Sequence, residues 1–139
     1  MRTEKIVAAI LVVGLILRNF HIPGGTILTV LPMTLLALLY FPFGFYFLSD
    51  KKIDGKTVGF SIVSGLLLST LVIGCEFKVM HWTGAMMVLI FGLVTCLPIA
   101  VASYLNFTKS KEGENAVYFK NIFVRVVTFT IFGLLVMVL

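Results

Sequence analysis

The chain carries one residue pattern twice, with an offset of 60 residues. Four positions recur, as the pairs Gly14 and Gly74, Arg18 and Lys78, His21 and His81, and Gly24 and Gly84. The residues around them are apolar in both copies, and no gap is needed to align the copies. An internal repeat of this kind predicts two versions of one supersecondary unit that pack against each other. Each unit contains an apolar helix, a cation, a histidine, a glycine and a second apolar helix.

The charge content excludes an ordinary soluble domain. Of the 139 residues, 60% are hydrophobic and only 12% are charged, whereas soluble domains carry about 25% charged residues. Too few polar side chains are present to cover a water-facing surface, so we expect an all-α integral membrane protein in contact with the lipid bilayer. The net charge of +5 does not indicate a nucleic-acid partner, because the cations are scattered between apolar segments and form no basic stripe.

Hydropathy predicts a single membrane domain over residues 1–139 with about five transmembrane helices. The predicted segments are residues 5–20, 26–48, 57–80, 84–107 and 118–139. The first hairpin repeat therefore covers residues 5–48, the second covers residues 57–107, and a closing helix follows. Pro23 and Gly24 mark the first turn, because proline cannot continue a helix and glycine permits positive φ. The first segment is short for a span, which usually needs about 20 residues.

The distribution of cations predicts the orientation in the membrane. If all five segments span, eight of the eleven Lys and Arg residues lie on the same side as the amino terminus. The positive-inside rule then puts the amino terminus in the cytoplasm and both histidine turns outside. The two hairpins have parallel topology in this arrangement.

The cation and histidine of each repeat are candidate functional residues. Arg18 and His21, like Lys78 and His81, are three positions apart and share a helix face. In one interpretation the cations extend to the interface and the histidines cap the last carbonyls of the helices. In the other, both turns form one outward-facing polar cluster for a proton, an anion or a partner loop. No metal site is expected, because no carboxylate or thiol stands at ligand spacing beside the two histidines.

Glu76 is the only acidic residue inside the predicted spans. A charge at membrane depth is costly and therefore indicates a function or a specific partner. Arg18 is the expected partner, because it lies at a similar depth on the first segment. A structural ion pair and a proton-handling site are both compatible with the sequence.

A row of small residues, Ser61, Gly65 and Ser69, recurs every four positions on the third segment. Such a row permits close approach of membrane helices and predicts a helix-packing face. No catalytic residue set or nucleotide motif is found, so neither an enzyme nor a cofactor is expected.

Residues 77–85 resemble the hairpin signature of the gliding motility protein GldL family, a Phe-Lys-x-x-His-Trp-Pro-Gly-Ala turn between two membrane helices. Residues 17–25 form a weaker copy, which keeps Pro23 where the second copy has Thr83. Proteins of this family are inner-membrane subunits of a proton-driven motor for gliding and type IX secretion, with GldM as partner. The resemblance implies a bacterial inner membrane location, an external hairpin turn and Lys78 and His81 as its polar residues.

The resemblance does not extend to the motor mechanism. The family's second hairpin helix carries a buried glutamate that is tied to proton use, but residues 26–48 and 84–107 contain no acid. We therefore expect a small membrane subunit or scaffold of an envelope, motor or secretion assembly, with a membrane-protein partner or a second copy of itself. The alternative is a small transporter or a proton- or ion-conducting protein. It would use a cluster of Arg18, His21, Glu76, Lys78 and His81.

Overall fold

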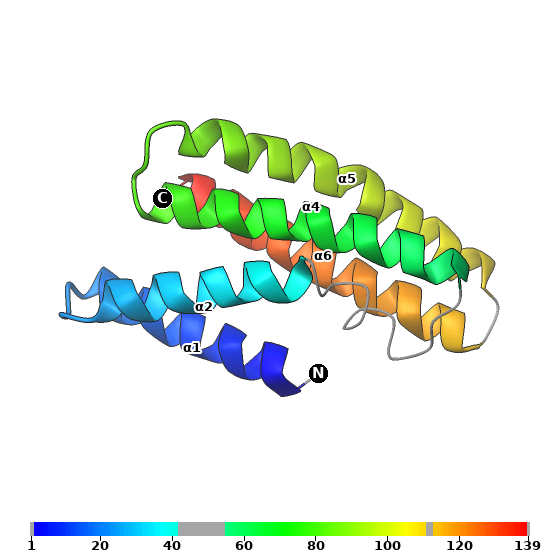
Figure 1. The fold of residues 1–139 in the computed structure, drawn as a ribbon, viewed down its shortest axis with the longest axis horizontal. Coiled ribbons are helices and arrows are strands. Elements are labelled where there is room, and N and C mark those ends of the chain that lie inside the picture. Colours follow the sequence, from blue (N-terminus) through cyan, green and yellow to red (C-terminus); the bar gives the residue numbers. More distant parts are fainter. Residues whose placement is uncertain (1, 42–54, 111–112, 139) are drawn as a thin grey trace.

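The computed structural model describes residues 2–41, 55–110 and 113–138. These ranges contain five α-helices and no strand: α1 (Arg2–Asn19), α2 (Gly25–Tyr40), α4 (Gly55–Val79), α5 (Ala85–Lys109) and α6 (Glu114–Val138) (Figure 1). The predicted all-helical class is therefore confirmed. The end of the second predicted segment and most of the first polar stretch, residues 42–54, lie outside the described residues.

Three of the described helices are long and apolar enough to cross a membrane. They are Val58–Val79 within α4, the whole of α5, and Asn115–Val138 within α6. The helix α2 is apolar but has only 16 residues. The helix α1 has charged residues at both ends, with Glu4 in its first turn and Arg18 in its last turn. The finding supports association with a membrane through at least these three helices.

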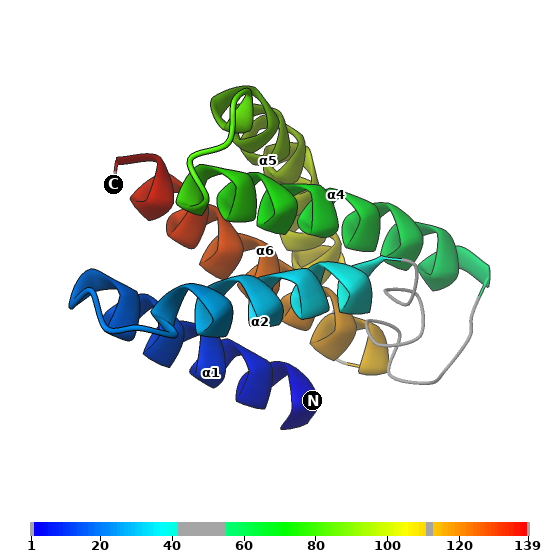
Figure 2. The same cartoon turned by 60° about the vertical axis from the view of Figure 1, so that its left-hand side comes forward.

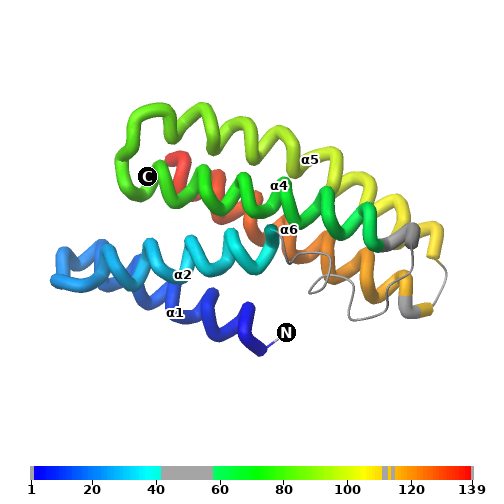
Figure 3. The backbone as a smooth tube through the Cα atoms, in the orientation of Figure 1, coloured from blue at the N-terminus to red at the C-terminus, as the bar shows by residue number. Residues whose placement is uncertain are grey.

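The helices form two hairpins and a closing helix. The pair α1 and α2 packs side by side, as do α4 and α5, and α2 joins the two hairpins by packing on α4 (Figure 2). The helix α6 packs against α4 and α5. Both interhelical turns and the carboxyl end of α6 lie at the same end of the bundle, as the tube in Figure 3 shows. The fully buried large side chains come from four helices: Met33, Leu36, Leu68, Leu71, Leu89 and Ile122.

Glycines bring the two helices of each hairpin into backbone contact. A Cβ on Gly74 of α4 would lie 2.8 Å from the Cα of Leu89 on α5. Gly14 of α1 lies in the same way against the backbone carbonyl of Leu28 on α2. That carbonyl has no helical donor, because Pro32 is four residues further on and has no N–H. The first glycine of each repeat, Gly14 or Gly74, thus has a packing role.

Candidate functional site

The turn between α1 and α2 and the turn between α4 and α5 have the same backbone hydrogen bonds. In the first, the N–H of His21 donates to the carbonyl of Arg18 at 2.9 Å, and the N–H of Ile22 donates to Leu17 at 3.0 Å. In the second, His81 donates to Lys78 at 3.1 Å and Trp82 donates to Phe77 at 3.0 Å. This pair of bonds defines a Schellman motif, which satisfies the last carbonyls of a helix. The histidines therefore cap through their backbone.

The histidines occupy the left-handed position of the motif. His21 has a φ of 56° and His81 a φ of 57°, and they are the non-glycine residues with positive φ in the described chain. Histidine is enriched in this region relative to other side chains. Gly24 and Gly84, with φ of 96° and 83°, complete each turn before the next helix. The chain thus turns at the histidine, two residues earlier than Pro23 suggests, and Thr83 occupies the proline position without changing the turn.

We expect the stability of His81 variants to depend on how readily the new residue adopts a positive φ. His81→Gly should stabilise the protein by about 0.5–1 kcal/mol, whereas His81→Val should destabilise it by about 1 kcal/mol. Thr83→Val, in the same turn but without positive φ, serves as control and should change little. Unfolding by sodium dodecyl sulfate in mixed micelles, followed by circular dichroism, measures all three. A glycine variant as unstable as the valine variant would show that the imidazole, and not the backbone, stabilises the turn.

The four basic side chains of the repeated pattern line one pocket of about 400 Å³. Arg18 and His21 come from the end of α1, and Lys78 and His81 come from the end of α4. Asn19 and Val79 also line the pocket, together with apolar side chains of α1 and α6, here called the apolar wall: Leu15, Phe132, Leu135 and Val136. The pocket thus has basic and apolar lining residues beside the two turns. Figure 1 shows that these turns lie at the same end of the bundle.

Arg18 connects the two hairpins within this pocket. Its Nη2 donates to the backbone carbonyl of Val79, the last residue of α4. A cation at this place also interacts favourably with the negative end of the α4 dipole. Its Nη1 is buried and has no hydrogen-bond partner among the described residues. The guanidinium therefore retains an unused donor group.

Glu76 lies outside the pocket and does not pair with Arg18. Its Oε1 accepts a hydrogen bond of 2.8 Å from the hydroxyl of Thr34 on α2. The Thr34 side chain is exposed and Glu76 is half-buried, so this contact lies on the outside of the bundle where α2 meets α4. The expected cluster of five residues thus separates into a basic pocket and an acidic contact on the outer surface.

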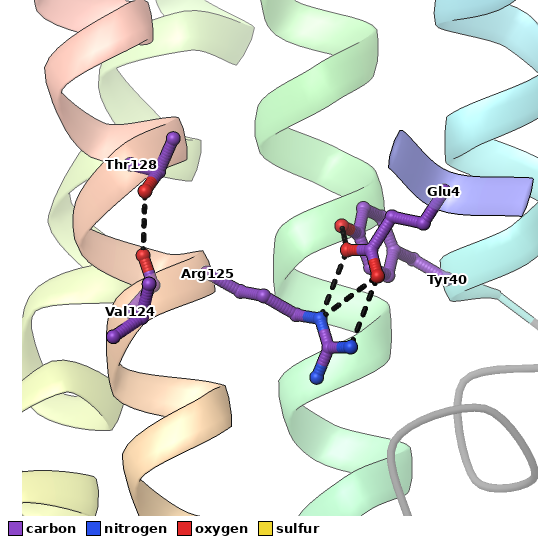
Figure 4. Close-up of polar contacts among 5 residues, drawn as sticks. All are labelled: Glu4, Tyr40, Val124, Arg125 and Thr128. Atoms are coloured by element: carbon purple, nitrogen blue, oxygen red, sulfur yellow. Dashed lines mark hydrogen bonds and ion pairs between the residues drawn. The ribbon is translucent and has the colours of Figure 1, made fainter. Parts of the chain in front are cut away.

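A second polar contact, absent from the sequence-based candidates, joins the first and last helices. The carboxylate of Glu4 accepts bonds from Nε of Arg125 at 2.9 and 3.1 Å and from Nη2 at 2.9 Å (Figure 4). The hydroxyl of Tyr40 donates to Glu4 Oε1 at 2.5 Å. Glu4 stands one residue before the predicted first segment and is therefore not among the acidic residues inside the predicted spans. Its place in the first turn of a helix was the available signal.

The small-residue row of α4 lies at helix contacts. Ser61 and Ser69 are buried, as is Gly65. The hydroxyl of Ser61 forms a hydrogen bond with the hydroxyl of Tyr118 on α6. This face of α4 therefore carries part of its contact with α6.

No group of three or more His, Cys, Asp or Glu side chains that could hold a metal ion is found in the described ranges. Comparisons with protein-family models, with curated proteins and with solved structures give no match.

Proposed function

We propose that the protein is a small integral membrane subunit or scaffold of the bacterial inner membrane, built from two tandem GldL-like hairpins and a closing helix. In this proposal all five helices cross the bilayer, with the amino terminus in the cytoplasm and both turns outside. The chain assembles with a membrane-protein partner, or with a second copy, in an envelope, motor or secretion complex. The repeated turn with its Schellman motif supports the tandem arrangement.

The contact between Glu76 and Thr34 carries the proposal of a partner. It is a polar pair next to exposed apolar side chains of α2 such as Leu31 and Leu35. Lipid chains offer no hydrogen bonds to such a pair, whereas a neighbouring helix does. We infer that a partner helix covers this seam between α2 and α4.

The alternative of a proton or ion conductor is less well supported. It requires an acid and a basic cluster along one path, but Glu76 bonds to Thr34 and not to the basic pocket. A flux assay in liposomes distinguishes the two functions. A conductor should lose proton flux in Glu76→Gln, whereas a subunit has no flux to lose.

The test of the subunit proposal is gentle-detergent affinity purification from native membranes, with the bound proteins quantified by mass spectrometry. We expect one membrane protein, or a second copy of the chain, at a fixed ratio. Glu76→Leu should reduce its recovery at least about fivefold, because the contact is lost while the fold remains. Thr70→Leu on the same helix is the matched control, since the Thr70 hydroxyl bonds only to the carbonyl of Leu66 in its own helix. Recovery of the chain alone, or equal recovery with both variants, would contradict the proposal.

A further inference from the structure

We propose that the pocket between the two turns binds a phosphate group, carried by an anionic lipid headgroup or free in solution. The site would use Arg18, Lys78 and the imidazoles of His21 and His81. This inference goes beyond the subunit role and does not depend on a protein partner. It rests on the charge, the unused donor and the shape of the pocket.

The charge of the lining favours an anion. Arg18 and Lys78 are cationic, both histidines add hydrogen-bond donors, and no acidic residue lines the pocket. Glu76 lies two residues before Lys78, but it accepts a hydrogen bond from Thr34 on the outside of the bundle. The like charges of Arg18 and Lys78, which line one pocket, repel each other. A bound anion removes that repulsion.

The unused nitrogen of Arg18 indicates that the guanidinium can hydrogen-bond a further acceptor. Its Nη1 is buried without a partner among the described residues, while Nη2 is held by the carbonyl of Val79. A buried charged donor without an acceptor is costly. A phosphate oxygen is the acceptor that a guanidinium binds best after carboxylate.

The position of the pocket at two helix ends does not oppose anion binding. The negative ends of helix dipoles repel anions when their carbonyls are free. Here the Schellman bonds of the two turns occupy the carbonyls of Leu17, Arg18, Phe77 and Lys78, and Arg18 occupies that of Val79, so these carbonyls are not free. The donors that remain in the pocket belong to the basic side chains and to the amide of Asn19.

The apolar wall adapts the pocket to an amphiphile. Leu15 of α1 and Phe132 and Leu135 of α6 line the same pocket as the basic side chains, and Leu135 is more than half exposed. An acyl chain can lie along this wall while its phosphate contacts Arg18 and Lys78. The volume of about 400 Å³ is in the range of small-molecule sites.

The test is isothermal titration calorimetry of the full chain in a neutral maltoside detergent. One titrant is dioctanoyl-phosphatidylglycerol and the other is inorganic phosphate. The variants are Arg18→Gln and Lys78→Gln, and Lys120→Gln is the control because it removes the same charge near the start of α6, away from the turns. We expect each pocket variant to weaken binding about tenfold, the loss of one charge-assisted hydrogen bond, and the control to bind like the wild type.

The two titrants separate the sources of phosphate. Saturable binding of the phospholipid that depends on Arg18 and Lys78 identifies a lipid site, and binding of inorganic phosphate with the same dependence but none of the lipid identifies a free-phosphate site. Lys78→Gln keeps the experiment decisive if Arg18→Gln unfolds, because Arg18 also holds the end of α4. Absence of binding to either titrant, or equal loss in the Lys120 control, overturns the proposal.

Discussion

Replacing Gly74 by alanine should destabilise the bundle by about 2–3 kcal/mol, a cost typical of overpacking a contact that cannot relax. The added Cβ would lie 2.8 Å from the Cα of Leu89 and 2.9 Å from its backbone nitrogen. Both atoms belong to the α5 backbone, so no side-chain rotation relieves the clash. The two helices would have to separate, and the fully buried Leu71 and Leu89 would lose contacts with their neighbours.

Gly59 provides the control on the same helix. A Cβ there would have no atom within 4 Å, and alanine is favoured over glycine in a helix by about 1 kcal/mol. Gly59→Ala should therefore leave stability unchanged or raise it slightly, while Gly74→Ala lowers it. Unfolding by sodium dodecyl sulfate in mixed micelles compares the two. A Gly74→Ala variant as stable as Gly59→Ala would mean that α4 and α5 do not touch at this position.

The position of each hairpin turn could be predicted from the sequence, but the interactions that form the turn could be predicted only in part. Pro23 and Gly24 predicted the first turn, and one of two interpretations gave the histidines a capping role. The structure adds that His21 and His81 cap through backbone N–H groups at positive φ. Side-chain chemistry draws attention to the imidazole, but the left-handed backbone position is the feature that a Schellman motif requires.

The partners of the charged residues were harder to predict from the sequence, because they depend on how each helix is rotated about its axis. Hydropathy gives the depth of Glu76 but not whether it faces α1 or α2, and the expected bond to Arg18 is a bond to Thr34 instead. The basic pocket was predictable because the repeat places equivalent residues at equivalent turns. The apolar wall from α6 was not, since nothing in the repeat indicates where a fifth helix packs.

Breaking the contact between Glu4 and Arg125 should also destabilise the protein strongly. We expect Glu4→Gln to lower the free energy of unfolding by about 2–3 kcal/mol. Loss of a fully buried ion pair costs about 3–5 kcal/mol, and here the two side chains are still 16% and 20% exposed. Glutamine keeps an acceptor for the hydroxyl of Tyr40 but loses the negative charge that accepts hydrogen bonds from Nε and Nη2 of Arg125. Micelle unfolding of Glu4→Gln and of Lys5→Gln, an exposed neighbour on α1, measures the difference.

The contact between Glu4 and Arg125 is also important because it joins α1 to α6. In the described chain α1 packs against α2, while α6 packs against α4 and α5, so the bond from Glu4 to Arg125 is a direct link between the first and last helices (Figure 4). A double-mutant cycle with Arg125→Gln isolates this link from the other contacts of the arginine. A coupling energy of about 2 kcal/mol would show that the pair holds α1 against the bundle. A coupling near zero, with Glu4→Gln no less stable than Lys5→Gln, would show instead that α1 is held through α2 alone.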